Sequence, residues 1–171
     1  TCAFDVIGAE YIRDVKPGEV IRIDLEGITS ERYATTCDQS MCSMEYVYFA
    51  RPDSDVEGIN VHQARKNCGR ILAQEAPIEA DIVVGVPDSG LSAAIGYAEE
   101  ANIPFEIGMV KNKYIGRTFI QPSQALREQG VKMKLSAVRS IVKDKRVVLI
   151  DDSIVRGTTS RRMVDMLREA G

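Results

Sequence analysis

Three short apolar runs, separated by segments with helical spacing, constrain the fold of this chain most strongly. The runs are DIVVGVP at residues 81–87, IPFEIGMV at 103–110 and RVVLID at 146–151. Their apolar residues are nearly continuous rather than alternating, which is typical of strands buried on both faces. Strands that alternate with helices form parallel sheets with helices on both sides. The sequence therefore predicts an α/β fold built on a parallel sheet.

The segments around these strands carry apolar residues three and four positions apart, as amphipathic helices do. In the first of them, Asn60 suits the N-cap position. We expect Cys68 to face the core there and His62 to lie off the apolar face. A further strand would be expected after the last helix, which indicates a truncated domain. The residues predicted to face the core are Val61, Ala64, Cys68, Ile71 and Leu72, then Leu91, Ala94, Ile95 and Ala98, and finally Met163, Met166, Leu167 and Ala170.

Residues 1–45 differ from the rest and are predicted to form short strands and turns. A β-rich stretch, GEVIRIDLEGI at residues 18–28, opens after a Pro-Gly pair. The stretch MEYVYFARPDS at 44–54 is predicted to be another strand, ended by its Arg-Pro-Asp sequence. The piece between Met109 and Arg146 is longer than an ordinary connection, and pieces of that length are usually functional or mobile.

Length and composition limit the class of protein. With 171 residues, 44% of them hydrophobic, the chain can form one sizeable core and a smaller appendage. It shows no apolar run of about 20 residues and no N-terminal signal pattern, so a cytoplasmic protein without a membrane segment is expected. Free buried thiols are favoured over disulfides or a metal site, because the cysteines lack a CxxC repeat and only one histidine accompanies them. These residues are Cys2, Cys37, Cys42, Cys68 and His62.

The net charge of −3 conceals an uneven distribution. Residues 1–58 carry 12 acidic and 5 basic side chains, a net of −7. Between Lys111 and Arg139 there are seven basic side chains and a single acid, Glu128, a net of +6. Such a segment is either a solvated basic face or part of a site for a polyanion. Nucleic acid is disfavoured, because few aromatic residues and no nucleic-acid-binding motif accompany the charges.

Two of the predicted strands end in polar sequences that suit a ligand site. One ends in GVPDSG, with Asp88 and Ser89, and the other in IDDSIVRGTTS, with Asp151 and Asp152. Ligands of open parallel sheets bind beyond the carboxyl ends of the strands. At residues 157–160, a glycine followed by three hydroxyl residues at a helix start can cradle a phosphate. Carboxylates beside a phosphate are reasonable if they hold sugar hydroxyls or Mg²⁺, so a phosphorylated sugar with a magnesium-bound second phosphate group is predicted.

Other motifs fit these strand ends less well. A P-loop needs lysine where Leu91 follows GVPDSG, and no GxGxxG follows any predicted strand. In a phosphoacceptor receiver domain the acceptor aspartate lies on a later strand, whereas this chain ends 19 residues after Asp152. A helix-capping pair would explain one aspartate and one threonine, but not the full run from Gly157 to Ser160.

The segment VVLIDDSIVRGTTS resembles the phosphoribosyl-pyrophosphate (PRPP) motif of type I phosphoribosyltransferases. The flanking segments CSMEYVYFARPDS, GVPDSG and KNKYIGRTFIQPSQALREQGVKMKLSAVRS narrow the resemblance to amidophosphoribosyltransferases, and best to the bacterial subgroup with an iron–sulfur cluster. The resemblance covers essentially the whole chain. It implies that residues 1–45 are the end of a glutaminase domain and that residues 46–171 are an incomplete phosphoribosyltransferase domain.

The resemblance also implies roles for individual residues. Asp151 and Asp152 would contact the ribose hydroxyls and Mg²⁺, with Ser89 as a third residue on the magnesium side. The loop formed by Asp88, Ser89 and Gly90 would face pyrophosphate. The 5-phosphate would be held by Arg156, Gly157, Thr158, Thr159 and Ser160. The basic segment would be a flexible loop, expected to be partly mobile over residues 112–136, whose Lys113, Tyr114, Gly116, Arg117 and Thr118 stabilise the leaving pyrophosphate.

Among the cysteines, the resemblance gives Cys42 the place of the first iron ligand. A 4Fe-4S cluster needs four ligands as a rule, so it is expected in the full-length protein and not in this fragment. Cys2 precedes AFDVIGAEY, which resembles the end of the glutaminase domain, so Cys2 is not expected to be the glutaminase nucleophile.

The implied reaction converts PRPP and glutamine-derived ammonia into 5-phosphoribosylamine and pyrophosphate, the committed step of purine synthesis. Purine nucleotide inhibitors and a full-length homo-oligomer are also implied. A PRPP-binding regulatory module without catalysis, as in some purine-responsive repressors, is the alternative. A repressor needs a DNA-binding element, and the acidic balance of residues 1–58 argues against one.

Overall fold

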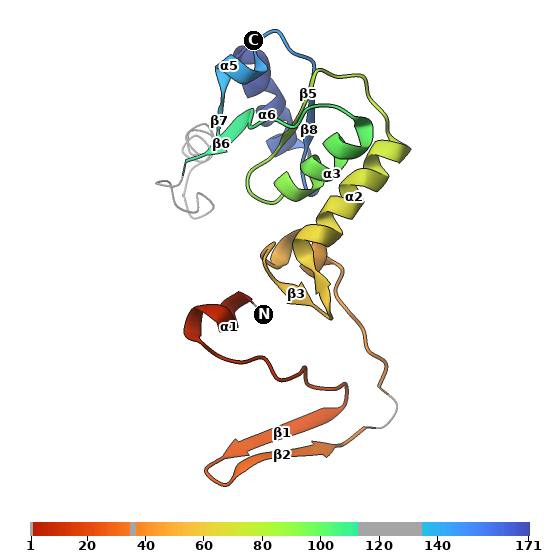
Figure 1. Cartoon of the computed structure of the whole chain (residues 1–171), viewed down its shortest axis with the longest axis vertical. Helices are drawn as coiled ribbons and strands as arrows, with labels where there is room; N and C mark the ends of the chain where they lie inside the picture. Colours follow the sequence, from red (N-terminus) through yellow and green to blue (C-terminus); the bar gives the residue numbers. More distant parts are fainter. Residues whose placement is uncertain (1, 35–36, 113–134) are drawn as a thin grey trace.

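A parallel sheet forms the centre of the upper body in Figure 1, which shows a computed structural model of the chain. Its residues 2–34, 37–112 and 135–171 are described below. Strand β5 (Ile82–Gly85) pairs with strand β8 (Val147–Ile150) in parallel, with Ile82 opposite Val147. On the other side of β5, Val83 makes a parallel bridge to Phe105. The predicted parallel α/β sheet is therefore confirmed.

The two faces of this sheet explain why its strands are apolar at nearly every position. Side chains at alternate positions enter two different cores, because successive residues of a strand point to opposite faces. One core contains Val83, Val148 and Ile150, together with residues of two helices. The other contains Ile82, Val84 and Val86, together with Met109, Val142 and Met163. A continuous apolar run is what a strand covered on both faces needs.

Helix α3 (Leu91–Ala101) covers the first face, and α2 (Val61–Glu75) lies beside α3 and reaches this core with Ala73. The predicted N-cap is confirmed, since the side-chain oxygen of Asn60 accepts a hydrogen bond from the Gln63 N–H at 3.1 Å. In α3, the predicted Ala94 and Ala98 are buried, while Leu91 and Ile95 are half-buried.

The face of α2 that points inward differs from the prediction. Its buried residues are Val61, Arg65, Gly69 and Ala73, whereas Ala64 is half-buried and the predicted Cys68, Ile71 and Leu72 are exposed. The reason is a close approach of two helix backbones. A Cβ on Gly69 would lie 1.9 Å from the Ala93 carbonyl oxygen of α3. Contact at this distance requires glycine at position 69, so packing against α3, rather than the apolar stripe of α2, selects the buried face.

The second face is covered by α6 (Thr158–Glu169) and the short α5 (Arg139–Val142). The predicted face of α6 is confirmed, because Met163 is buried and Met166, Leu167 and Ala170 pack against the same core. The predicted strand at 103–110 is only partly correct. Beyond the bridge at Phe105, its end belongs to β6 (Met109–Lys111), which pairs antiparallel with β7 (Leu135–Ala137).

The prediction of a strand at residues 44–54 is wrong for the first half of that stretch. Residues Glu45–Phe49 form a single π-helical turn, η1, which is followed by the small hairpin of β3 (Asp55–Val56) and β4 (Ile59–Asn60). The buried Arg65 of α2 donates hydrogen bonds to the carbonyls of Tyr46 at 2.6 Å and Ala50 at 2.8 Å. These bonds satisfy one carbonyl within the turn and one directly after it, a tertiary contact that strand propensity cannot reveal.

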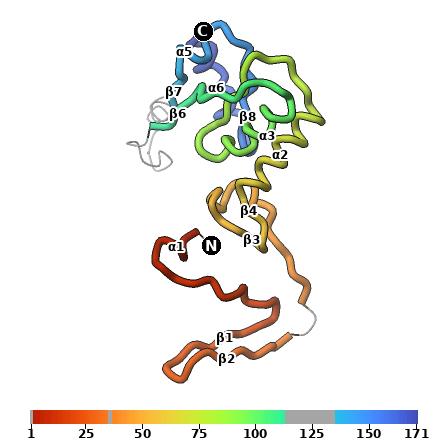
Figure 2. The backbone as a smooth tube through the Cα atoms, in the orientation of Figure 1, coloured from red at the N-terminus to blue at the C-terminus, as the bar shows by residue number. Residues whose placement is uncertain are grey.

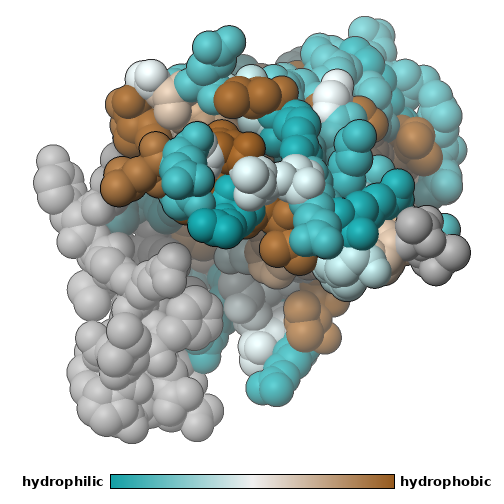
Figure 3. Space-filling model, turned by 90° about the horizontal axis from the view of Figure 1, so that it is seen from below, coloured by the Kyte–Doolittle hydropathy of each residue, from teal (hydrophilic) through white to brown (hydrophobic). Residues whose placement is uncertain are grey.

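The N-terminal part lies at the opposite end of the molecule from the sheet (Figures 1 and 2). It consists of α1 (Cys2–Ile7), which the sequence did not predict, and the expected hairpin of β1 (Glu19–Asp24) and β2 (Gly27–Arg32). None of residues 2–34 is fully buried. Seen from below, this end of the molecule shows hydrophobic patches among hydrophilic ones (Figure 3). Large apolar side chains exposed in the hairpin region are Val20, Ile23, Leu25 and Ile28.

All four cysteines are free, as predicted, but they are not buried. Cys37, Cys42 and Cys68 are exposed, and Cys2 is half-buried, with its sulfur 3.0 Å from the Ser54 hydroxyl. The interpretation of Cys68 as a core residue is wrong for the reason given above for α2.

Candidate functional site

The ends of β5 and β8 bring two polar loops to one edge of the sheet. The Val86 N–H donates a hydrogen bond to the Ile150 carbonyl at 2.8 Å, which fixes the last residues of the two strands together. A Cβ on Gly90 would lie 2.5 Å from the same Ile150 oxygen. Glycine therefore allows the loop of Asp88, Ser89 and Gly90 to pack against the end of β8, directly before Asp151.

The acidic pair stands at this edge in a partly buried setting. Asp151 and Asp152 are both half-buried, unlike most carboxylates of the chain. The Asp152 N–H donates to an Asp151 carboxylate oxygen at 2.9 Å, and the Ser153 hydroxyl donates to an Asp152 carboxylate oxygen at 2.6 Å. Burial raises the pKa of Asp151, with a smaller contribution from the negative charge of Asp152. Two carboxylates held close together in this way favour a cation or hydroxyl ligands between them and the solvent.

A buried cation lies behind this pair. Arg65 is 5% exposed, and burial lowers the pKa of its guanidinium, while the charge of Asp152 acts in the opposite direction. Arg65 also carries the bonds to η1 described above. It therefore links the segment that follows Cys42 to the electrostatic environment of the acidic pair, a link for which the sequence gave no signal.

The start of α6 has the form expected of a phosphate cradle. Gly157 has a φ of +72°, in the left-handed region that favours glycine, and no side chain caps the helix. The first N–H groups of a helix lack intrahelical partners, and the positive end of the helix dipole adds to their attraction for anions. Thr158 and Thr159 are exposed and Ser160 is half-buried, while Arg156 is exposed just before them.

The pyrophosphate-facing loop of the prediction carries an ion pair that sequence analysis missed. The Lys111 ammonium lies 2.7 Å from a carboxylate oxygen of Asp88. Lys111 ends β6, and the pair joins this strand to the loop after β5. The positive excess of residues 111–139 was the available signal, but charge alone does not assign a partner. The carboxylate of Asp88 would repel an anionic ligand, and Lys111 offsets that charge.

The described residues fit Mg²⁺ only as part of a site shared with a ligand. Asp151, Asp152 and the half-buried Ser89 offer oxygen atoms, the ligand type that Mg²⁺ prefers. In residues 2–34, 37–112 and 135–171, no three His, Cys, Asp or Glu side chains gather as a metal site. Mg²⁺ commonly binds through one or two carboxylates plus substrate phosphates, so two carboxylates suffice for such a shared site.

Other predicted site residues stand apart from this edge. Cys42 is exposed just before η1, where its carbonyl accepts a hydrogen bond from the Glu45 N–H at 3.1 Å. It has no cluster of metal-ligating side chains around it among the described residues, so these residues do not fit an iron–sulfur cluster. Lys113, Tyr114, Gly116, Arg117 and Thr118 lie outside the described residues, as does nearly all of the segment 112–136 that was expected to be mobile.

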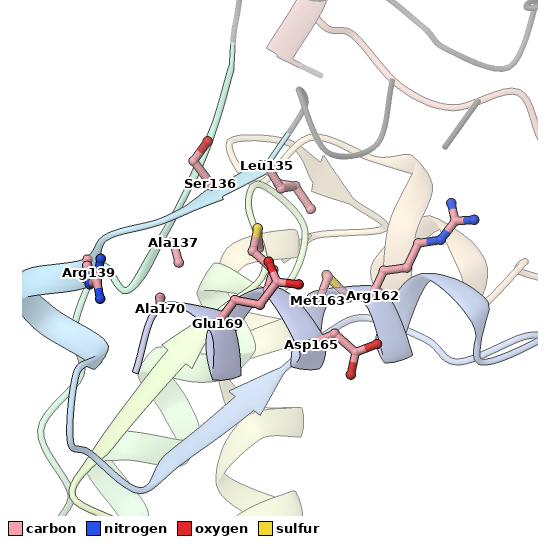
Figure 4. A pocket seen from close by; sticks show the side chains of 10 residues that line it. Leu135, Ser136, Ala137, Arg139, Arg162, Met163, Asp165, Glu169 and Ala170 are labelled. Atoms are coloured by element: carbon pink, nitrogen blue, oxygen red, sulfur yellow. The ribbon is translucent and has the colours of Figure 1, made fainter. Parts of the chain in front are cut away.

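A cavity of about 620 Å³ lies between β7 and α6 (Figure 4). Its floor is apolar, with Met163 and Met166 of α6 beside Leu135 and Ala137 of β7. Charges of both signs surround it, namely Arg139, Arg162, Asp165 and Glu169. Sequence analysis did not predict this cavity, because it forms between elements whose packing local sequence patterns do not report.

Comparison with known proteins agrees with this geometry. The sequence pattern of the phosphoribosyl transferase domain matches residues 59–171, about two thirds of the chain. The chain belongs to the phosphoribosyl transferase domain family. The matched region includes β5, β8 and both polar loops, and so contains the candidate site. It begins at β4, whereas the sequence analysis placed the boundary near residue 46.

Individual relatives of the chain are amidophosphoribosyltransferases. It is 68% identical over all 171 residues to that of Bacillus subtilis (strain 168), of which it covers 36%, and 57% identical to that of Staphylococcus aureus (strain MRSA252), of which it covers 35%. The chain thus spans about a third of the length of these relatives.

Two solved structures are similar over 99% of the chain, at 68% identity and with 37% of their own length covered. One, with a TM-score of 0.89, is described as the allosteric regulatory enzyme of purine biosynthesis. The other, with a TM-score of 0.88, is glutamine PRPP amidotransferase from B. subtilis complexed with ADP and GMP. The resemblance to amidophosphoribosyltransferases stated from the sequence motifs is confirmed by these relatives. In the part of the chain that the structure describes, no helix has the length and apolarity to cross a membrane.

Proposed function

We propose that this chain is the PRPP-binding part of an amidophosphoribosyltransferase. The observation that carries the proposal is the half-buried acidic pair at the end of β8, placed beside a glycine-initiated helix and the loop after β5. A ligand with a sugar between two phosphate groups matches these three features. The sugar would contact the acidic pair, one phosphate the start of α6, and the other the loop after β5. The family match and the names of the relatives support PRPP as that ligand.

In this proposal each loop binds one part of PRPP. Asp151 and Asp152 accept hydrogen bonds from the ribose hydroxyls and, with Ser89, provide oxygen ligands for Mg²⁺. Gly157 to Ser160, with Arg156, bind the 5-phosphate through backbone N–H groups and hydroxyls. Asp88 to Gly90 face the pyrophosphate. Mg²⁺, when bound, would neutralise charge on the pyrophosphate and so favour its departure.

The reaction proposed for the full-length protein is a displacement at C1 of the ribose. Ammonia forms a C–N bond as the bond from C1 to the pyrophosphate oxygen breaks, and the bonding pair leaves with pyrophosphate. The resemblance assigns Lys113, Tyr114 and Arg117 to the leaving group, and this assignment stays a prediction. Ammonia would come from glutamine hydrolysed in a separate domain, of which we propose residues 1–45 to be the end.

The binding proposal is tested by titrating PRPP into the protein calorimetrically, with and without Mg²⁺. We expect binding to require Mg²⁺ and to weaken at least tenfold when Asp151 and Asp152 are both replaced by asparagine. Asp165→Asn is a matched control, since it removes a carboxylate of α6 that lies away from the acidic pair and should leave binding unchanged. Unchanged binding in the double variant would refute the assignment of the site.

A second measurement separates the enzyme from a non-catalytic PRPP-binding module. The protein is supplied with PRPP, Mg²⁺ and either ammonium or glutamine, and pyrophosphate release is followed. An enzyme should release pyrophosphate with ammonium and not with glutamine alone, because Cys2 has no histidine near it in sequence to activate it as a nucleophile. PRPP binding without release under ammonium favours the module. Release with glutamine alone would overturn the assignment of residues 1–45.

Further features of the relatives stay proposals for the full-length protein. Nucleotide inhibition is suggested by the B. subtilis structure with ADP and GMP. A homo-oligomer and a cytoplasmic location are expected from the resemblance. For the iron–sulfur cluster, we propose that Cys42 is a ligand only in the full-length protein. Iron analysis of the 171-residue chain should therefore find no stoichiometric iron.

A further inference from the structure

The only histidine of the chain lies close to the candidate site without belonging to it. His62 is in the first turn of α2, and its Nδ1 atom lies 2.9 Å from the hydroxyl oxygen of Ser92, in the first turn of α3. His62 is half-buried and Ser92 is 5% exposed. Because the hydroxyl can donate or accept, this hydrogen bond is compatible with either tautomer of the imidazole.

The position of this bond in the fold connects it to the ligand edge of the sheet. Helix α2 precedes β5 and α3 follows it, so both helices begin at the edge where β5 ends. The backbone N–H of His62 donates a hydrogen bond to the Pro52 carbonyl at 3.1 Å, which anchors the start of α2. Ser92 is only two residues beyond Gly90, which itself packs against the end of β8.

The two helices are held together elsewhere by other contacts. Gly69 and Gly96 allow close backbone packing in the middle of the helices, and Glu99 binds both Lys66 and Arg70. The His62–Ser92 bond is thus not needed to pair α2 with α3. It adds a constraint at the one end of α3 from which the loop of Asp88 to Gly90 emerges.

We propose that His62 is a positioning residue for the pyrophosphate-facing loop Asp88–Gly90, acting through its hydrogen bond to Ser92. The inference rests on the proposed function, since it assumes that this loop faces the pyrophosphate of PRPP. His62 touches no reacting atom in this proposal. Its effect is to hold the first turn of α3, and with it the loop, in the geometry that the ligand needs.

The ligands for the test are chosen to separate the two ends of the site. Mg²⁺-PRPP and Mg²⁺-pyrophosphate use the loop, whereas ribose 5-phosphate uses the acidic pair and the start of α6. We expect His62→Ala to weaken binding of the first two about tenfold, the size of one lost hydrogen bond, and to change ribose 5-phosphate binding less than twofold. Asn67→Ala, on the exposed face of the same helix, should change none of the three.

Two conservative variants test the atom that acts. In asparagine a polar side-chain atom can occupy the place of Nδ1, while in glutamine it corresponds to Nε2. His62→Asn should therefore restore Mg²⁺-pyrophosphate binding to within about threefold of the parent protein, and His62→Gln should not. Ser92→Ala should reproduce His62→Ala, and the double variant His62→Ala/Ser92→Ala should be no weaker than either alone, because both remove the same bond.

A measurement on the unaltered protein covers the case in which the variants do not fold. The single histidine gives one imidazole Hε1 signal in the NMR spectrum, which should shift when Mg²⁺-pyrophosphate is added and stay in place when ribose 5-phosphate is added. The inference is wrong if the parent protein binds Mg²⁺-PRPP but His62→Ala weakens binding of the three ligands equally or not at all. It is also wrong if the variants are unfolded and the signal of the unaltered protein does not shift. If the parent protein does not bind Mg²⁺-PRPP, the proposed function itself fails.

Discussion

At the scale of single residues, polar side chains in this protein act by satisfying particular backbone or charged partners. Arg146 and Asp81 are an example at the edge of the sheet opposite the candidate site. The Arg146 N–H donates to an Asp81 carboxylate oxygen at 2.7 Å, and its guanidinium contacts the other oxygen at 3.0 Å. These bonds hold together the residues that directly precede β5 and β8.

This pair predicts how stability depends on pH. The hydrogen bonds from Arg146 lower the pKa of Asp81 to about 2, from an ordinary value of 3.8. A carboxylate with a lowered pKa in the folded state stabilises the fold above its unfolded pKa, and that contribution is lost as the pH falls toward the folded value. We expect Asp81→Asn to flatten the pH dependence of the free energy of unfolding between about pH 4 and pH 2, as measured by urea denaturation.

A neighbouring carboxylate provides the control. Glu79 lies 3.8 Å from the same arginine, but its side chain is 96% exposed. Glu79→Gln removes the same charge without removing a bond to the Arg146 backbone, and its pH profile should match that of the parent protein. Equal slopes in Asp81→Asn and the parent protein would contradict the role given to the Arg146–Asp81 bonds.

At the scale of elements, the helices are placed by close contacts that depend on residue size and on buried polar bonds. Helix α2 lies against α3 where two glycines allow the backbones to meet, and it holds η1 through the guanidinium of Arg65. Neither contact follows the apolar stripe of α2. A single substitution can disrupt each contact. One adds a side-chain carbon at Gly69, and the other removes the guanidinium of Arg65.

Gly69→Ala is expected to destabilise the protein, although alanine ordinarily favours a helix over glycine. The new Cβ would lie 1.9 Å from the Ala93 carbonyl oxygen, which is backbone and cannot rotate away. Separating α2 from α3 should lower the free energy of unfolding by about 2–3 kcal/mol. Thermal unfolding followed by circular dichroism would measure this. Asn67→Ala, on the exposed side of the helix, should change stability by less than about 0.5 kcal/mol.

Arg65→Met should release η1. The variant keeps an apolar chain of similar length but leaves the carbonyls of Tyr46 and Ala50 without their side-chain donor. We expect a loss of about 2–4 kcal/mol in the free energy of unfolding, because two half-buried carbonyls lose their charged donor. Arg70→Met is the matched control on the same helix, where the ion pair with Glu99 is partly exposed and is expected to contribute under about 1 kcal/mol. Equal losses in the two variants would count against the proposed role of Arg65.

At the scale of the whole molecule, the chain has a well-packed α/β body and an N-terminal part without a core. The two core clusters contain only residues from 73 onwards. An isolated two-stranded hairpin is marginally stable in water, and the β1–β2 hairpin leaves its large apolar side chains exposed. These features support the proposal that residues 1–45 are the end of a separate domain of the longer protein.

Deleting residues 1–40 should therefore leave the α/β body intact. The melting temperature is expected to stay within about 2 °C of the parent value, because the deletion removes no fully buried residue among those described. Binding of Mg²⁺-PRPP should also be unchanged. A much lower melting temperature would show that the N-terminal part contributes to the core, contrary to its exposure. Deleting Val61–Glu75 instead removes α2 and should abolish folding. This deletion shows how the measurement responds when the α/β body is disrupted.

The sequence by itself determined the parallel sheet, because a strand buried on both faces must be apolar at successive positions, as Ile82 to Gly85 are. It also determined the position of the acidic pair at the end of a strand and of Gly157 at the start of a helix. A charged pair after a buried strand and a glycine before a helix have few structural uses.

The tertiary structure decided which face of α2 is buried, why residues 45–49 turn into η1, and that Lys111 and His62 pair with Asp88 and Ser92. Each of these depends on a partner from another element, and local sequence patterns report propensity and apolarity but not the distance between elements.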